Sequence, residues 1–137
     1  MLLNGDLKEL ARLTAATAAF CREHALDDDV EFDLNLATEE LFTNTLNHGH
    51  CQGGDAIAEV VFTMQPGGVA VEYADRGEPF NPLDAPVPDI SAPLGQRPDG
   101  GLGVHLVRQI MRDFEYQRAA GWNRLRMRRP IPGGSTP

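Results

Sequence analysis

Hydrophobic side chains in the first third of the chain recur every three or four residues, as they do in amphipathic helices. One helix is predicted from Asp6, as its N-cap, to about His24. A second is predicted from about Asp29 to His48, where Gly49 ends it. The apolar positions of the first helix are Leu7, Leu10, Ala11, Leu13, Ala18 and Cys21. Those of the second form one row that we expect to be buried, namely Val30, Leu34, Ala37, Leu41 and Thr45.

From residue 56 onwards the pattern changes to the alternation that is typical of β-strands. Two alternating segments, AIAEVVFTMQ at 56–65 and VAVEYAD at 69–75, flank the turn sequence PGG. They predict an antiparallel hairpin. The side chains expected to share a face are Ala58, Val60, Phe62 and Met64 in the first strand, and Val69, Val71 and Tyr73 in the second.

The last third of the chain repeats this pattern once, after a long interruption. Residues 81–99 are rich in proline and have no periodicity, and a loop of this length in a compact domain is commonly functional. A third helix is predicted over 102–113. A second hairpin is predicted with strands at 114–118 and 123–129, on either side of the turn AAGW.

This order of elements predicts a single α/β two-layer sandwich over residues 1–137. We expect a mixed sheet of about four strands, covered on one face by three helices. The folded core is predicted to span residues 6–129, followed by a tail at 130–137. The sequence MLLNG at the beginning is too short for more than a stub of a strand.

Composition narrows the class of protein. The net charge is −8, with an acidic excess before residue 100 and a basic excess after it. Such a domain is a poor binder of nucleic acid. There is no apolar run of the length that a membrane helix needs and no signal peptide, so we expect a cytoplasmic protein without membrane contact. Cys21 and Cys51 lack metal-site spacing and are predicted to be free thiols.

The arginine-rich segment NRLRMRR, residues 123–129, allows two interpretations. It could attract a ligand that carries phosphate. It is more often the solvated face of a strand, and we favour that interpretation.

Polar side chains recur on one face of the second predicted helix. Glu40, Asn44 and His48 are four residues apart, so they share a helical face. On a helical wheel Glu40 and Asn44 lie beside the apolar row rather than opposite it. Side chains at that position either form the rim of a site or are ordinary polar residues of the surface.

Two further clusters flank the proline-rich stretch. DRGEPF begins at Asp75, at the end of a predicted strand, and GGLGVHL begins at Gly100, at the start of the third helix. Glycines at a helix N-terminus can bind anions, although they are often only tight turns. The segment has neither P-loop nor Rossmann spacing. Asp75 before a glycine is common turn chemistry, but its carboxylate could also accept a hydrogen bond from an exocyclic amine.

Together these three motifs resemble the nucleotide-binding motifs of the GHKL, or Bergerat-fold, ATPases. Glu40 to Gly49 resembles the N box, DRGEPF the G1 box and GGLGVHLV the G2 box, in the same order. The resemblance covers about residues 6–129. Within this superfamily the chain is similar to short anti-sigma factor serine kinases of the RsbW type.

The resemblance implies ATP and Mg²⁺ as cofactors, and it implies roles for individual residues. Glu40 would be the catalytic base, with adjacent Glu39 as a less favoured candidate, and Asn44 would hold Mg²⁺. Asp75 would bind the adenine amine. His48 would lie at the rim, and residues 81–99 would form a lid over ATP. The remaining nucleotide-binding positions would be Gly77, Phe80, Gly100, Gly101, Leu102, Gly103 and Val104.

The chain also departs from relatives in this family. The missing first strand leaves homodimerisation open. Asn123 stands about where relatives carry a threonine near adenine, and Arg12 stands where they often carry an arginine that contacts a partner. Arg12 could equally be an ordinary surface residue.

The function implied is that of a serine/threonine protein kinase in a bacterial partner-switching circuit. Its partner would be a STAS-type antagonist, with a sigma factor as a second candidate. The alternative is an ATP-sensing interaction module that does not transfer phosphate. A detached histidine-kinase domain is a third hypothesis, but the chain has no dimerising helical hairpin with a phosphoacceptor histidine.

Overall fold

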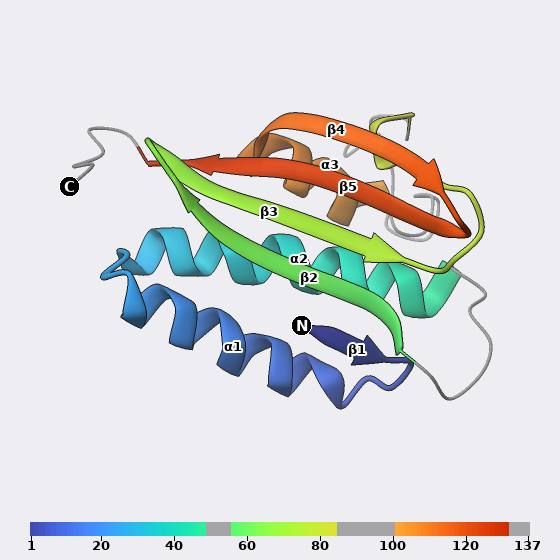
Figure 1. The fold of residues 1–137 in the computed structure, drawn as a ribbon, viewed down its shortest axis with the longest axis horizontal. Coiled ribbons are helices and arrows are strands. Elements are labelled where there is room, and N and C mark those ends of the chain that lie inside the picture. Colours follow the sequence, from blue (N-terminus) through green and yellow to red (C-terminus); the bar gives the residue numbers. More distant parts are fainter. Residues whose placement is uncertain (49–55, 85–100, 132–137) are drawn as a thin grey trace.

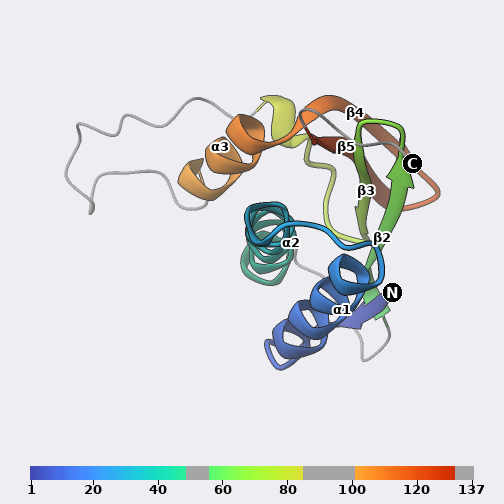
Figure 2. The same cartoon turned by 90° about the vertical axis from the view of Figure 1, so that its left-hand side faces the viewer.

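Three α-helices cover one face of a five-stranded sheet in the computed structural model, which describes residues 1–48, 56–84 and 101–131 (Figure 1). The side view shows the sheet as one layer and the helices as the other (Figure 2). The elements are β1 (Leu2–Asn4), α1 (Glu9–Glu23), α2 (Asp28–His48), β2 (Ala56–Gln65), β3 (Gly68–Asp75), the 3₁₀ helix η1 (Pro82–Asp84), α3 (Gly101–Ile110), β4 (Arg112–Ala119) and β5 (Trp122–Pro130). The predicted two-layer sandwich is therefore confirmed.

The sheet is antiparallel throughout, with the order β1-β2-β3-β5-β4, so the prediction of a mixed sheet is wrong. A helical crossover usually leads to a parallel neighbouring strand. Here β4, which follows α3, does run in the same direction as β3. However, β5 returns from the hairpin and pairs between them, so that every neighbouring pair is antiparallel.

The fifth strand comes from the N-terminal residues, which were predicted to form only a stub. β1 pairs with β2 through Leu2↔Glu59 and Leu3↔Ala58. Backbone hydrogen bonds between Met1 and Val60 extend the pairing. Leu3 is fully buried, which explains why so short a segment is held on the sheet.

Both hairpin turns contain a glycine whose backbone is in the left-handed region. Gly67 has φ 79° after Pro66, as in a type II turn, and the pair Ala120 and Gly121 has φ 53° and 82°. Only the glycines adopt such angles without a steric penalty. Both predicted hairpins are confirmed. β2 has the predicted limits, and β3, β4 and β5 extend one or two residues beyond theirs.

Helix ends differ from the predictions in two places. The N-cap of α1 is Lys8 rather than Asp6. Asp6 instead accepts hydrogen bonds from the backbone N–H groups of Lys8 and Glu9, which forms a turn before the helix. α3 ends at Ile110 instead of 113, because the chain enters β4 at Arg112. The last strand, β5, includes Pro130, so the sheet extends one residue past the predicted end of the core at 129.

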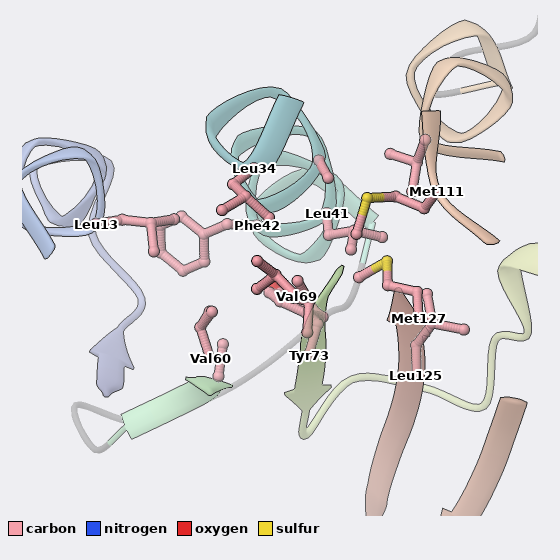
Figure 3. Packing of buried hydrophobic residues seen from close by; sticks show 14 of the residues in the cluster. Leu13, Leu34, Leu41, Phe42, Val60, Val69, Tyr73, Met111, Leu125 and Met127 are labelled. Carbon is pink, nitrogen blue, oxygen red and sulfur yellow. The ribbon is translucent and has the colours of Figure 1, made fainter. Parts of the chain in front are cut away.

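The core lies between the sheet and α2, which occupies the centre of the helical layer (Figure 3). The whole predicted row of α2 is buried, and Phe42 fills the space toward α1. In the first helical segment Leu7 and Ala11, two of the apolar positions, are exposed, because Leu7 precedes α1 and Ala11 faces solvent. Met64 is also more exposed than its strand pattern indicated.

Cys21 is buried, and its burial together with the nearby charge of Glu31 raises the pKa of its thiol. Cys51 lies outside the described residues. None of the helices in the described part of the chain combines the length and apolar character needed to cross a membrane.

Arg124, Arg126 and Arg128 lie on the outer face of β5, and Arg129 lies on the face turned toward α2. On the outer face of the sheet Arg124 and Arg126 pair with Glu72, at 3.0 and 3.5 Å, and Arg128 pairs with Asp113 at 2.7 Å. These ion pairs favour the interpretation of a solvated strand face over that of a phosphate site.

Candidate active site

The C-terminal half of α2 presents two adjacent carboxylates to different neighbours. Glu39 accepts a hydrogen bond from the hydroxyl of Thr14, 3.1 Å away on α1. Glu40 lies about 100° further around the helix and faces α3 instead. Asn44 follows one turn after Glu40 and is half-buried. The α2 sequence therefore separates a carboxylate that joins two helices from one that faces the candidate site.

Glu40 packs directly against the first turn of α3. A Cβ atom on Gly103 would lie 2.2 Å from Oε2 of Glu40 and 3.0 Å from its Cδ. Only glycine leaves room for the carboxylate at this position. Because the N-terminus of a helix favours negative charge, the first turn of α3 stabilises an anion there. It would stabilise a phosphate group for the same reason.

Asp75, the last residue of β3, is half-buried and receives three hydrogen bonds. Its Oδ1 accepts from the backbone N–H of Gly77 at 3.0 Å and from Nδ2 of Asn123 at 2.9 Å. Its Oδ2 accepts from the hydroxyl of Thr45 at 2.8 Å. Thr45 Oγ1 lies 2.6 Å from the hydroxyl of buried Tyr73, which can donate to it in turn. The carboxylate is thus held in one orientation by groups from α2, β5 and its own loop.

Asn123 on β5 connects this carboxylate to the loop after β3. Besides donating to Asp75, its Nδ2 donates to the carbonyl of Glu78 at 2.8 Å. Its Oδ1 accepts from the backbone N–H of Phe80 at 3.2 Å and from the hydroxyl of Tyr116 at 2.5 Å. The side chain is only 7% exposed. A buried amide with this many partners is a rigid element of the site.

A small cavity lies where these elements meet. Its volume is about 20 Å³, room for about one water molecule. It combines apolar walls with a few polar groups, which is the usual composition of a ligand pocket. The lining residues are Leu41, Asn44, Tyr73, Asp75, Phe80, Pro82, Tyr116, Asn123 and Leu125.

The structure brings several of the sequence-predicted residues together. Asn44, Asp75 and Phe80 line the same cavity, and Gly77 is bonded to Asp75. Phe80 is 41% exposed, at the outer side. At the other end of the site, Gly103 contacts Glu40. Val104 points into the core, so its side chain serves packing.

Other predicted residues lie outside what the structure describes. His48 ends α2, and Gly101 and Leu102 begin α3, but the side chains of His48 and Leu102 are not described. Gly100 falls in the segment 85–100, together with most of the predicted lid at 81–99. Within the described part of that stretch, Pro82–Asp84 forms η1.

Three polar residues of the site were not predicted from the sequence. Thr45 was assigned to the apolar row of α2, Tyr73 to the core face of β3, and Tyr116 to a strand without a role. Thr45 lies on the face of α2 that is turned toward the sheet, and Tyr73 and Tyr116 lie on strand faces turned toward the helical layer. A hydroxyl that is buried between the two layers needs a hydrogen-bond partner. A buried hydroxyl near a carboxylate was the signal that could have pointed to Thr45 and Tyr73.

Comparison with known proteins agrees with this geometry. The chain matches the family of the histidine kinase-like ATPase domain over residues 3–129. Because the match covers most of its length, this protein belongs to that family.

Comparison with individual relatives identifies a narrower group within this family. The chain is 32% identical to the serine/threonine-protein kinase BtrW of Bordetella bronchiseptica over 117 residues, which is 82% of each chain. It is 33% identical to the serine-protein kinases RsbW of Bacillus cereus and Bacillus anthracis over 116 residues, covering 82% of this chain and 71% of theirs. The predicted resemblance to RsbW-type proteins is therefore confirmed.

Proposed function

We propose that this protein is an ATP-dependent serine/threonine protein kinase that phosphorylates a STAS-type antagonist in a bacterial partner-switching circuit. The similarity to proteins named as serine kinases supports the reaction class. The single observation that carries the proposal is the half-buried Glu40 carboxylate held against the N-terminal turn of α3. A carboxylate beside an anion-binding helix end is suited to phosphoryl transfer.

Asp75 would bind the base of the nucleotide. Its carboxylate is an acceptor, lines the cavity and is fixed by three hydrogen bonds, so it can select an exocyclic amine such as that of adenine. Gly77, which is buried next to it, would let the base approach the backbone. Since the cavity itself holds only about one water molecule, the exposed ring of Phe80 would shift when a purine enters.

The first turn of α3 would hold the phosphates through the backbone N–H groups of Gly101 and Gly103. Asn44 suits the Mg²⁺ ion that this family implies. Its amide lines the cavity, is half-buried and makes no hydrogen bond within residues 1–48, 56–84 and 101–131. Mg²⁺ commonly uses one or two protein oxygens plus water and substrate phosphates. When bound, it would neutralise negative charge on the phosphates.

Glu40 would act as the general base. Its carboxylate lies beside the position at which α3 favours phosphate, so it can orient the attacking hydroxyl of the protein substrate and accept its proton. Adjacent Glu39 is bonded to Thr14 on α1 and faces away from that position. The geometry therefore supports Glu40 over Glu39 as the base.

The partners belong to the same proposal. Arg12 on α1 pairs with Glu9. Because its side chain is 55% exposed, its guanidinium can also contact a protein partner at the surface. A sigma factor is a second candidate partner. We propose a cytoplasmic location, in which these partners and ATP are present together.

The deciding experiment uses γ-labelled ATP and Mg²⁺ with the purified protein and an extract of its source cells. A labelled serine or threonine should appear on a small protein. Glu40→Gln should lower the rate of transfer by about 10²–10⁴-fold, the usual contribution of a general base. Glu39→Gln is the matched control and should keep the rate.

Two results would count against the kinase. Absence of transfer with ATP binding intact would assign the protein to the alternative class, an ATP-sensing interaction module. Transfer that survives Glu40→Gln but not Glu39→Gln would show that the wrong glutamate was chosen.

A further inference from the structure

The amide of Asn123 uses its full hydrogen-bonding capacity. A primary amide has two N–H donors and two acceptor positions on its oxygen. Nδ2 donates to Asp75 Oδ1 and to the carbonyl of Glu78. Oδ1 accepts from the Phe80 N–H and from the Tyr116 hydroxyl. The nucleotide-binding roles proposed above for Asp75 and Gly77 do not require such an arrangement, so it calls for a separate explanation.

The orientation of this amide is determined by its neighbours. On the Nδ2 side the partners, a carboxylate and a carbonyl, can only accept hydrogen bonds. On the Oδ1 side the backbone N–H of Phe80 can only donate. A flipped amide would face a donor with a donor and acceptors with an acceptor. Tyr116 adds a further donor on the oxygen side and so stabilises the same orientation.

The hydrogen bonds between Asp75 and other described residues leave one acceptor position of its carboxylate for a ligand. A carboxylate accepts about four hydrogen bonds. Oδ1 takes two of them, from Gly77 and Asn123, and Oδ2 takes one, from Thr45. The remaining position is on Oδ2. Asn123 and Gly77 hold Oδ1 together, and the Asn123 bond fixes the direction in which the carboxylate offers its remaining lone pair to the cavity.

Asn123 also fixes the loop on which a base would rest. It binds the backbone of Glu78 and Phe80, and Arg118 on β4 donates to the carbonyl of Gly77 at 2.7 Å. Residues 77–80 are thereby held against β4 and β5 at the level of Asp75. One side chain thus sets both the direction of the acceptor and the wall beside it.

We propose that Asn123, oriented by Tyr116, is a positioning residue that makes the site selective for a nucleobase with an exocyclic amine. This inference rests on the proposed nucleotide site. Asn123 acts through Asp75, by keeping one Oδ2 acceptor position directed to the ligand. The ligand class is a 6-aminopurine nucleoside triphosphate. A nucleotide identical except for the missing amine loses the bond that Asn123 prepares.

The test compares the dissociation constants of ATP and of purine riboside 5′-triphosphate, which lacks the 6-amino group, with the full chain and Mg²⁺. The ratio of the two constants isolates the amine, because phosphate, ribose and metal contributions cancel. The wild type should prefer ATP by about 10-fold or more, the value of a hydrogen bond to a charged group. Asn123→Ala should reduce the ratio to about one or two, because Asp75 Oδ1 loses the bond that fixes the direction of the carboxylate.

Two further variants keep the test decisive. Tyr116→Phe retains the ring that lines the cavity and removes only the hydroxyl, so its ratio should fall partway, to about threefold. Gln117→Ala, at an exposed neighbouring position on β4, should keep the wild-type ratio. If Asn123→Ala does not fold, as judged by circular dichroism, Tyr116→Phe decides, and an unchanged ratio overturns the proposal.

The remaining outcomes separate this inference from the proposed function. If both constants rise equally in Asn123→Ala, the residue serves only stability and the inference is wrong. If the wild type binds the two nucleotides equally, nucleotide binding stands and the selectivity role falls. If the wild type binds neither, the proposed function fails together with the inference.

Discussion

Figure 1 shows that α2 begins beside the last residues of β5 and finishes beside the last residues of β3. The half-buried charged side chains at these two ends differ in the ion pairs that they form. At the end where α2 begins and β5 finishes, Arg129 is 13% exposed and donates to Asp33 at 2.8 Å. Asp29 lies 3.7 Å from the same guanidinium. At the other end, where α2 and β3 finish, Asp75 and Glu40 form no ion pair within the described part of the chain. The charge of Arg129 is therefore balanced by carboxylates at the first end, whereas the carboxylates at the second end have no cation among the described residues.

This difference distinguishes charged groups that stabilise the fold from charged groups that serve the candidate site. Even a half-buried charge without a partner of opposite sign is unfavourable for folding, so its presence points to a use other than stability. The paired arginine connects the first turns of α2 to the end of the sheet. Asp75 and Glu40 have no cation among the described residues, which leaves a negatively charged site that a ligand with an amine, or phosphates with their metal, would complete. We therefore expect substitutions at the first end to change stability, and those at the second to change binding and rate.

The largest effect is expected at the second end, for Asn44→Ala. The variant removes the one amide that lines the cavity without a hydrogen bond to the described residues. Affinity for ATP in the presence of Mg²⁺ should fall by about 100-fold, the upper value for a bond to a charged group. Calorimetric titration with and without Mg²⁺ measures it, and unchanged binding of Mg-ATP would exclude Asn44 as the metal ligand.

At the end of α2 that carries the Arg129 ion pair, substitutions should change the stability of the protein but not its affinity for ATP. Arg129→Ala leaves Asp33 half-buried without its cation and should lower the free energy of unfolding by about 2 kcal/mol, less than for a fully buried pair. The matched control is Arg126→Ala, whose side chain is 67% exposed, and it should cost below about 0.5 kcal/mol. Urea unfolding measures both. Reduced affinity of folded Arg129→Ala for ATP would contradict the separation of the two ends.

A smaller effect is expected for Gly103→Ala. The added methyl group displaces the Glu40 carboxylate, which is the end of a flexible side chain, so the backbone need not move. The turnover number should fall by about 10-fold because the base is misplaced, with stability unchanged or slightly higher, since alanine favours helix over glycine. Gln109→Ala, on the exposed side of α3, is the control in single-turnover kinetics. A normal rate would mean that Glu40 acts from another position.

Local pattern was sufficient for the elements and for part of the site. The row from Val30 to Thr45 predicted the buried face of α2, and its edge correctly predicted that Glu40 and Asn44 lie beside the core rather than away from it. Side-chain direction along a helix follows from a rotation of about 100° per residue, which the sequence alone contains. The glycines at 67 and 121 predicted the two hairpin turns in the same way, because a turn is also determined by a few consecutive residues.

Contacts between distant segments could not be obtained in this way. Asn123 is 48 positions from Asp75 in the chain, and the hydrogen bond between them exists because β5, rather than β4, pairs with β3 in the register Asp75↔Asn123. The antiparallel order and the fifth strand were missed because strand neighbours depend on which edges the chain can reach. The hydroxyl of Tyr116 reaches Asn123 across the same hairpin, diagonal to its direct partner.

The sequence by itself determined which residues are helical or extended, which faces are apolar and which three motifs carry polar chemistry. These depend on interactions within a few residues of each other. Only the tertiary structure decided that Glu40 packs on Gly103, that Arg129 forms an ion pair while Asp75 forms none with the described residues, and that Asn123 holds the Asp75 carboxylate. Each of these depends on sheet order and on the packing of α2 between α1 and α3, which bring together side chains far apart in the chain.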